Sequence, residues 1–471
     1  MSSREEPAGR VARTTRLGKV AAKQVARQAA GNLRKPFQSE QEQARARDEQ
    51  MLRFADDLVV TLGSMRGAAM KLGQIISLLN FGLSSQQSRA EFSRRLAPLF
   101  NSAPAVDNDA LFKIIHGELG SEGRRLLATV DGAPIATASL GQVYRGTLHD
   151  GRDVAIKVQY PAARDAVRAD LKNMALLVRL RKPVYPVPGL EAVMDEVRQQ
   201  IEMELDYRHE WASHRAVYEA HRGHPVFVIP EPIDALCTDR VMVTEYINGT
   251  QLQDFSPGDQ AARDHVGEAI YRFYCGNIYT TGQFCADPHP GNILVLDDRR
   301  VAFLDFGLYI EMSDATLGVE RAILAAAMRG DATTAHALAC QAGFITDARA
   351  MPAPATLDYM HAVSGWYLLP GEVQMTDKIA HKALYQAMLP RSDYSDMIFQ
   401  QRMLGPHAFS RRTEMSVCAL LSTLAATARW HDIAAEWALD APPTTDMGRA
   451  IAAWQQAGQD AGSSAFIPPS R

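Results

Sequence analysis

The chain has 471 residues, of which 46% are apolar, so it can bury a large core in about two or three structural units. Its net charge of -4 is small and drawn from both signs, which argues against a nucleic-acid binder. The five Cys residues are scattered without a C-x-x-C pair, so we expect no disulfide framework and no zinc site.

The N-terminal region is the most basic part of the chain. Residues 10–35 contain eight Lys or Arg and no acidic residue, in a weakly amphipathic pattern. Such a helix can lie on an anionic membrane surface. A solvated basic arm is the alternative, because the segment has no Trp or Phe anchor. No apolar run reaches the roughly 18 residues that a membrane span needs, so we expect a cytoplasmic protein that can associate with membranes peripherally.

The next segments alternate between helical and strand patterns. Residues 51–79 have helical periodicity and end near "NFGLSS", and "DALFKIIHGELG" predicts a second helix. From about Val130 the character changes. The stretch "GAPIATASLGQVYRGTLHDGRDVAIKVQYP" alternates apolar and polar residues around "HDG", which predicts a β-hairpin.

Two long helices are predicted over 162–182 and 190–221, separated by the Pro-rich break "KPVYPVPG". The segment "VFVIPEPIDALCTDRVMVTEYING" then predicts two more strands. After Gln251 the chain is mostly helical to about Leu439, and the last residues form a tail that we expect to be disordered.

One stretch interrupts this helical region and concentrates polar residues, namely "ADPHPGNILVLDDRRVAFLDFGLYI". It places Asp287 and Asn292 five residues apart and Asp305 inside Asp-Phe-Gly. A nucleoside triphosphate needs a Lys at its α/β oxygens, oxygen ligands for Mg²⁺, and a residue that positions the acceptor. "VAIK" supplies Lys157 in a predicted strand. We therefore expect Asp305 to hold Mg²⁺, Asn292 to bind a second metal ion, and Asp287 to face the acceptor.

Several features differ from an ordinary protein kinase. Where a protein kinase has a Gly-rich loop over the phosphates, this chain has Ala136, Thr137, Ala138 and Ser139, and their Cβ atoms limit how closely backbone amides approach a nucleotide. No A-P-E tripeptide follows Asp305, so the peptide-docking segment has no visible counterpart. His289 occupies a variable position of the loop, and we interpret it as structural.

Taken together, these motifs resemble the ABC1/ADCK/UbiB family of atypical kinases, also called the AarF family, over roughly residues 50–440. "KLGQ" matches the K-x-G-Q motif of the family, and "ATASLGQVY" matches its Ala-rich loop. "ELDYRHE" matches its E-x-D motif and the following Glu, and "DPHPGN" matches its variant catalytic loop. Thr137 stands where the family usually has Ala.

The resemblance implies an α+β, two-lobed, protein-kinase-like fold with an N-terminal helical extension packed over the active site. The expected organisation is a basic arm over 1–50, the helical extension over 51–129, an N-lobe over 130–250, a C-lobe over 251–440 and a C-terminal tail over 441–471.

The resemblance also implies roles for residues outside the catalytic loop. Glu210 pairs with Lys157, while Glu204 and Asp206 form the E-x-D pair, of which Glu204 meets Lys71. Adenine binds the backbone of Glu245 and Ile247, as in kinase hinges. The regulatory residues implied in this way are Lys71, Gln74, Glu204 and Asp206, and the pair Lys71 and Gln74 shares one helix face.

The expected function is an atypical kinase or ATPase that uses ATP (or ADP) and Mg²⁺. The family implies a small or lipid-like substrate, such as an isoprenoid quinone precursor of ubiquinone biosynthesis. The expected partners are a nucleotide, that substrate and an anionic membrane surface, with no nucleic acid. One alternative is an ATP-binding regulatory module without phosphoryl transfer, and another is a conventional Ser/Thr protein kinase.

Overall fold

The computed structural model describes residues 108–137, 140–161, 202–256, 258–388 and 405–460, with Arg198 and scattered positions between 48 and 96. The chain divides into two compact units. The first comprises Met1–Gly117, Gly132–Tyr144 and Lys157–Leu205, and the second Glu118–Asp131, Arg145–Ile156 and Asp206–Arg471. The basic segment 10–35, the helix predicted over 162–182, the last eleven residues (461–471) and most of the helix predicted over 51–79 lie outside the described residues.

A long helix and a four-stranded sheet come first among the continuous elements. Helix α5 (Asn108–Leu126) includes the predicted "DALFKIIHGELG" helix and is kinked at Gly120, where φ is 52°. The sheet has the order β1-β2-β3-β5. Its strands are β1 (Leu127–Thr137), β2 (Gly141–Leu148), β3 (Asp153–Gln159) and β5 (Val241–Glu245).

The predicted hairpin around "HDG" is confirmed. The Leu148 N–H donates to the Arg152 carbonyl at 2.8 Å, and Gly151 adopts φ +89°, which favours glycine in this turn. Along β3 every second side chain is fully buried, because successive residues of a strand point to opposite faces. The half-buried Lys157 lies between the buried Ile156 and Val158.

The prediction of one continuous helix over 190–221 is wrong at one position. Residues 202–204 are helical, but the chain breaks at Leu205–Asp206, and α8 (Tyr207–Ala220) starts afresh. The Asp206 side chain accepts a hydrogen bond from the His209 N–H at 3.1 Å and so caps the new helix. Asp206 is exposed at the N-cap, and Glu210 is buried in the first turn of α8.

A second sheet and a two-stranded ribbon carry the polar stretch. The sheet has the order β4-β9-β8-β6, and the ribbon pairs β7 with β10. These strands are β4 (Phe227–Val228), β6 (Thr250–Gln251), β7 (Gln283–Cys285), β8 (Ile293–Val295), β9 (Val301–Phe303) and β10 (Tyr309–Glu311). The antiparallel register joins Ile293 to Phe303 and Cys285 to Tyr309.

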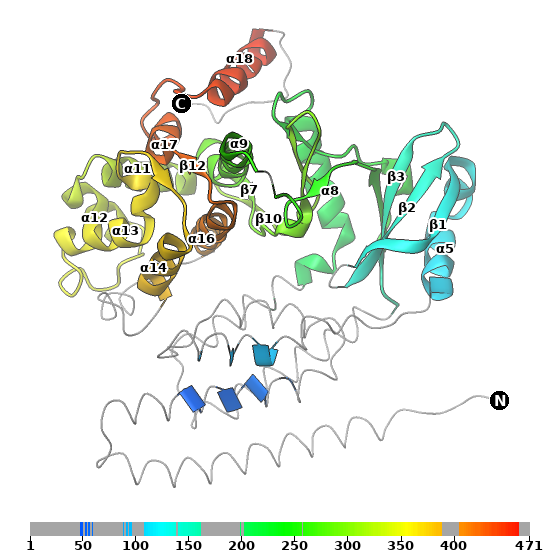
Figure 1. Cartoon of the computed structure of the whole chain (residues 1–471), viewed down its shortest axis with the longest axis horizontal. Coiled ribbons are helices and arrows are strands. Elements are labelled where there is room, and N and C mark those ends of the chain that lie inside the picture. The colour runs from blue at the N-terminus through cyan, green and yellow to red at the C-terminus, as the bar shows by residue number, and fades with distance from the viewer. Residues whose placement is uncertain are drawn as a thin grey trace. The chain divides into compact units, whose positions relative to one another are not determined.

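The rest of the second unit is mainly helical, as predicted. The helices are α9 (Gln260–Tyr271), η3 (Arg272–Gly276), α10 (Asn277–Thr280), α11 (Asp314–Met328), α12 (Ala332–Gln341), α13 (Ala353–Leu368), α14 (Asp377–Met388), α16 (Pro406–Leu424), α17 (Trp430–Ala438) and α18 (Asp446–Asp460). Strand β11 (Val373–Gln374) pairs antiparallel with strand β12 (Thr427–Ala428). Figure 1 shows α11, α12 and α13 packed in succession.

The core of this helical part is aromatic. The ring of Tyr271 lies 5.3 Å from both Trp366 and Trp430 and 5.1 Å from Trp437, measured between ring centroids. Trp430 is fully buried, and its indole N–H donates to the Val373 carbonyl at 2.9 Å. This cluster joins α9, α13 and α17.

Three further findings concern the described part of the chain. All five Cys residues are free thiols. Within the described part of the chain, no helix combines the length and apolar character needed to cross a membrane. Residues 446–460, which the sequence assigned to the C-terminal tail, form helix α18.

Candidate active site

The turn between Asp287 and Asn292 is held by its own histidine. Pro290–Asn292 form the short 3₁₀ helix η4, and His289 Nδ1 accepts a hydrogen bond from the Gly291 N–H at 3.1 Å. The Asn292 N–H donates to the His289 carbonyl at 3.0 Å. The ring therefore has the structural role predicted for it, because it caps the turn that presents Asn292.

Asp305 is brought beside this turn by the β8–β9 hairpin. The Leu304 N–H donates to the Asn292 carbonyl at 3.0 Å, which places the two loops side by side. Asp305 Oδ1 accepts a hydrogen bond from the Gly307 N–H at 2.9 Å, and the Cys285 thiol donates to the Asp305 carbonyl at 3.3 Å. The Asp305 loop is thus fixed both to the Asn292 turn and to β7.

Asp287 follows the other strand pair. Strand β7 ends two residues before it, and the Ala286 N–H donates to the Leu308 carbonyl at 2.8 Å, which extends the β7–β10 pairing to the residue next to Asp287. The backbone therefore brings together the three residues predicted from the sequence, Asp287, Asn292 and Asp305. The side chains of all three are half-buried.

Glu210 points toward the same loop from α8, although it lies far away in the sequence. Its side chain is buried, with 2% exposure. A Cβ atom at Gly307 would lie 3.3 Å from Asp305 Oδ1 and 3.6 Å from Glu210 Oε2. Two carboxylates thus approach Gly307, and in a buried place like charges need a cation between or beside them.

Aromatic rings pack against the residues on both sides of Asp305. Phe273 stacks on Phe303 with centroids 3.6 Å apart, and His214 of α8 packs edge-on against Phe306 at 4.8 Å. Tyr274 follows in η3, a π-helical turn of the kind often found at functional sites. Burial raises the pKa of Tyr274, and the nearby negative charges of Asp287 and Asp305 add to this effect, so the phenol stays neutral.

The donor set fits a magnesium ion bound together with a nucleotide. Asn292 and Asp305 offer amide and carboxylate oxygens, the hard donors that Mg²⁺ prefers, and their loops are joined by the Leu304 hydrogen bond. The described residues contain no cluster of three or more His, Cys, Asp or Glu that could hold a metal alone. Phosphate and water oxygens would have to complete the coordination sphere, as is usual for Mg²⁺.

Comparison with known proteins decides the family. A family model described as the ABC1 atypical kinase-like domain matches residues 98–339, a little over half of the chain. The chain belongs to this ABC1 family. This result confirms the resemblance drawn from the four motifs and, with the mixed helix and sheet structure, the predicted kinase-like fold class.

Two curated relatives are each 30% identical to this chain over the aligned residues. It is 30% identical over 254 residues to "Atypical kinase COQ8B, mitochondrial" of Rattus norvegicus, which covers 54% of this chain and 47% of the relative. It is 30% identical over 281 residues to "AarF domain-containing protein kinase 1" of Mus musculus, covering 58% and 52%. The chain therefore spans about half the length of the curated relatives it matches.

A solved structure supports the same fold. The complex of Rv3197 with erythromycin from Mycobacterium tuberculosis superimposes with a TM-score of 0.60 at 27% identity. The match covers 83% of this chain and 97% of that one.

The structure describes only some of the remaining residues that were predicted for the ABC1 site. Lys157 belongs to the first unit and Glu210 to the second, so their pairing stays a prediction. Ala136 and Thr137 are exposed at the end of strand β1 rather than in a loop, and Glu204 is half-buried. Lys71, Gln74, Ala138 and Ser139 lie outside the described residues, as does the predicted placement of the N-terminal extension over the site.

The structure limits which backbone groups of the predicted hinge adenine could contact. The Glu245 N–H donates to the Glu231 carbonyl at 2.8 Å, and the Tyr246 N–H donates to the Asp153 carbonyl at 3.0 Å. Adenine would therefore have to meet the Glu245 carbonyl, rather than its amide, and the backbone of Ile247.

Sequence analysis missed one charged residue at the site. Arg412 on α16 places Nη2 3.5 Å from Asp287 Oδ1. No motif surrounds it in "SRRTEMSV", and a pair of adjacent arginines in a helix is ordinarily solvent-exposed. Only the fold brings it to the catalytic loop.

Proposed function

We propose that this ABC1-family chain is an ATP- (or ADP-) and Mg²⁺-dependent atypical kinase or ATPase that acts on a small, lipid-like molecule. The observation that carries the proposal is the hydrogen bond from Leu304 to Asn292, together with the β7–β10 pairing. These contacts hold Asp287, Asn292 and Asp305 on adjacent loops, where Asp287 would face the acceptor and the other two would supply oxygen donors for a metal ion. Phosphoryl transfer needs this positioning more than it needs covalent chemistry.

Each residue has a part in the proposed reaction. Asn292 and Asp305 would hold Mg²⁺, which supplies charge neutralisation at the phosphates when bound. Lys157 would meet the α/β phosphate oxygens, and Glu210 would orient its ammonium group. Asp287 would accept the proton of the acceptor hydroxyl while the acceptor oxygen bonds to the γ-phosphorus. The bond to the β–γ bridging oxygen then breaks and ADP leaves with its electrons.

The nature of the acceptor is argued from the sequence. No A-P-E segment follows Asp305, which weighs against a peptide substrate and a conventional Ser/Thr kinase. The family resemblance implies a link to isoprenoid quinone biosynthesis, so a quinone precursor is the proposed substrate class. A cytoplasmic chain that reaches the membrane through residues 10–35 would meet such a substrate at the bilayer surface.

ADP formation by the purified protein tests the proposal, because phosphoryl transfer and ATP hydrolysis both produce ADP. The assay contains Mg-ATP with and without anionic liposomes and quinone-like phenols, and erythromycin serves as a further ligand because Rv3197 is solved with it. Turnover that is lost in Asp287→Asn, with Mg-ATP binding retained, supports the kinase or ATPase. Binding of Mg-ATP without turnover under every condition would favour the alternative, a regulatory module that changes shape with nucleotide.

A further inference from the structure

We propose that Arg412 is a positioning residue for Asp287, an inference that rests on the proposed function. The guanidinium Nη2 lies 3.5 Å from Asp287 Oδ1. The Arg412 side chain is 21% exposed and that of Asp287 is 34% exposed, so the pair is less screened by water than a surface ion pair. A planar guanidinium at this range restricts the rotamers open to the carboxylate.

The catalytic loop itself supplies no such group. Between Asp287 and Asn292 the chain reads Pro-His-Pro-Gly, with neither Lys nor Arg. The loop histidine is already used, because His289 Nδ1 caps Gly291. A permanent positive charge beside Asp287 therefore has to come from elsewhere in the fold, and Arg412 provides it.

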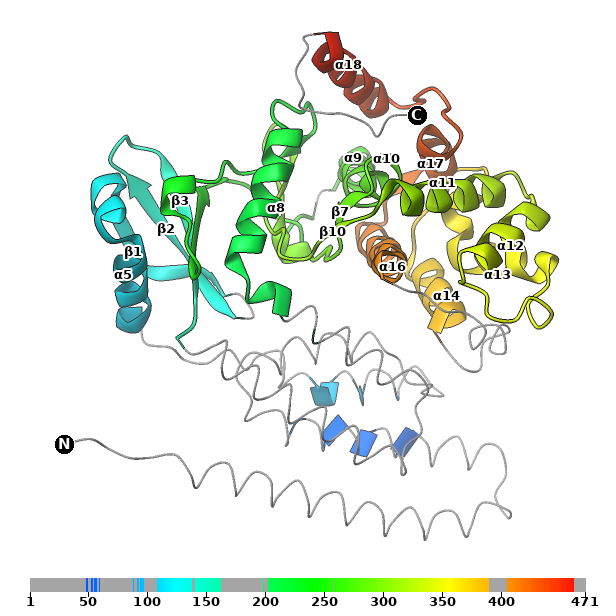
Figure 2. The same ribbon diagram turned by 180° about the vertical axis from the view of Figure 1, so that it is seen from behind.

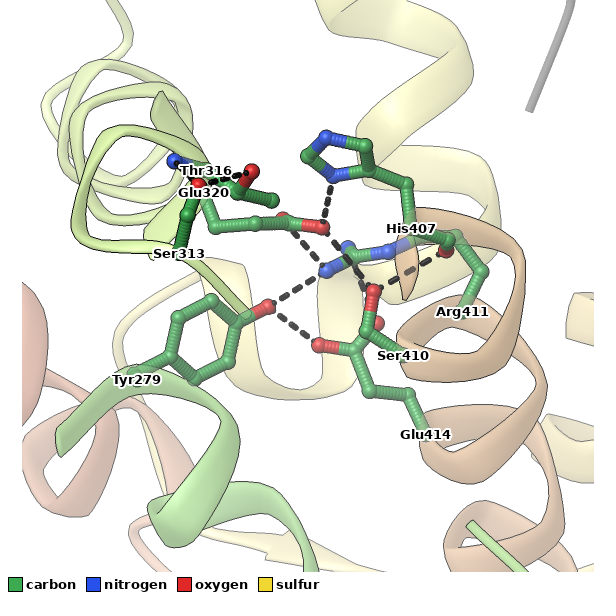
Figure 3. Close-up of polar contacts among 8 residues, drawn as sticks. All are labelled: Tyr279, Ser313, Thr316, Glu320, His407, Ser410, Arg411 and Glu414. Atoms are coloured by element: carbon green, nitrogen blue, oxygen red, sulfur yellow. Dashed lines mark hydrogen bonds and ion pairs between the residues drawn. The ribbon is translucent and has the colours of Figure 1, made fainter. Parts of the chain in front are cut away.

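The preceding residue explains why α16 can hold Arg412 in place. Figure 3 shows Arg411 inside a polar network between three helices. Its Nη2 lies 2.8 Å from Glu320 Oε2 on α11 and donates to the Tyr279 hydroxyl on α10 at 2.8 Å. Its Nη1 lies 2.9 Å from Glu414 Oε2, and the Tyr279 hydroxyl donates to Glu414 in turn.

Glu320 extends this network toward the start of α16. It is 4% exposed and accepts hydrogen bonds from His407 Nδ1 at 2.7 Å and from the Ser410 hydroxyl at 2.9 Å. Burial would raise the pKa of Glu320, but Arg411 and these hydrogen bonds outweigh it, so the pKa is lowered and the group stays ionised.

The network fixes the rotation of α16 about its axis. His407, Ser410, Arg411 and Glu414 have the i, i+3, i+4, i+7 spacing of a single helix face. Arg412 follows Arg411 by one residue and is turned by about 100° from that face. Helix α16 also contacts β10, the partner of the strand that leads to Asp287 (Figure 1, Figure 2). The guanidinium is therefore carried to Asp287 by a helix whose orientation is set elsewhere.

Arg412→Gln and Arg412→Lys test the proposal, with Arg321→Gln as the matched control. Arg321 makes a surface ion pair with Asp440 at 3.1 Å, well away from the catalytic loop in sequence. We expect Arg412→Gln to lower kcat for ADP formation at least about tenfold while Mg-ATP affinity changes by less than about twofold. Arg412→Lys should recover part of kcat, and Arg321→Gln should change neither quantity. An unchanged kcat, or a loss of affinity as large as the loss of kcat, overturns the proposal.

A second measurement does not depend on turnover. Melting temperatures of Arg412→Gln, Asp287→Asn and the double variant form a double-mutant cycle, and a positioning contact predicts that the two single effects do not add. Additive effects overturn the proposal. Absence of turnover in the unmodified protein would instead contradict the proposed function, and the cycle alone would then decide whether Arg412 holds Asp287.

Discussion

The N–H of Leu304 donates a 3.0 Å hydrogen bond to the carbonyl of Asn292, so the Asp-Phe-Gly segment and the turn that carries Asn292 are joined through their backbones. A side-chain substitution at Asp305 or Asn292 leaves this bond in place. The contribution of each side chain to metal and nucleotide binding can therefore be measured without dismantling the loops.

Asp305→Asn should abolish stabilisation by Mg-nucleotide. The amide keeps the shape of the carboxylate but removes the charge that holds the metal. Nucleotide at about 100 times its Kd stabilises a protein by about 2.7 kcal/mol, and this increment should disappear from thermal melts with Mg-ATP. Asp297→Asn, at an exposed position of the turn after β8, is the control and should retain it. A normal shift in Asp305→Asn would remove the metal role from this residue.

Glu320→Gln should destabilise the protein. The substitution removes the carboxylate partner of His407 and one of the two carboxylates beside Arg411, and breaking a fully buried pair costs roughly 3–5 kcal/mol. Because the Arg411 side chain is 30% exposed, we expect a smaller loss of about 2–3 kcal/mol. Urea unfolding measures the loss, and Arg321→Gln, one residue away on α11, should cost less than about 1 kcal/mol. Equal effects of the two substitutions would contradict a stabilising network.

His224 should make the protein less stable in mild acid. It is buried, its Nδ1 accepts hydrogen bonds from the N–H groups of Val226 and Phe227, and its ring packs against Trp454. Burial, with a smaller effect of His221, lowers the pKa of His224 to about 2. The unfolded chain therefore binds a proton below about pH 6.5 that the folded chain does not, and stability falls as the pH falls through that range.

The size of this effect is about 2 kcal/mol between pH 7 and pH 5, since each pH unit below the unfolded pKa contributes about 1.4 kcal/mol. His224→Asn keeps an acceptor near the position of Nδ1 but cannot titrate. Its free energy of unfolding should be lower at pH 7, because the ring contacts are lost, and should fall less on acidification than that of the unmodified protein. A variant that loses as much stability between pH 7 and pH 5 would show that His224 is not responsible.

Lys71→Ala should alter nucleotide handling more than stability. Ordinary protein kinases lack the K-x-G-Q motif of the ABC1 family, and the resemblance pairs Lys71 with Glu204. A Lys at the rim of a site contributes little to folding, so the melting temperature should change only slightly. Nucleotide affinities and self-labelling with radiolabelled ATP should change, with Lys71→Arg as the charge-preserving control. Identical affinities and labelling in a folded variant would mean that Lys71 has no functional role.

Deletion of residues 1–40 should reduce co-sedimentation with anionic liposomes. Eight basic residues over 10–35 supply the attraction, and added salt should weaken binding of the intact chain through screening. Neutral liposomes are the control. If the intact chain ignores anionic liposomes at low salt, the basic arm has another role.

The spacing of residues close together in the chain was enough to predict a hairpin, the loop residues of the candidate site and the family. The alternation of β3 and the turn at Gly151 predicted the hairpin, and the order of "VAIK", "DPHPGN" and "DFG" predicted the three loop residues that the backbone brings together. The motifs "KLGQ", "ATASLGQVY", "ELDYRHE" and "DPHPGN" predicted the family. These features depend on turn chemistry and on pairing between strands close in the chain, so a few residues carry the information.

Tertiary structure decided what depends on residues far apart. Asp206 breaks a pattern that is helical on both sides, because its carboxylate caps α8 more effectively than the helix could continue through it. Arg412 reaches Asp287 only because α16 is turned by a buried network with Glu320 on another helix. Residue spacing reports which side of its own helix a side chain occupies, but what faces that side is set by the packing of the whole unit.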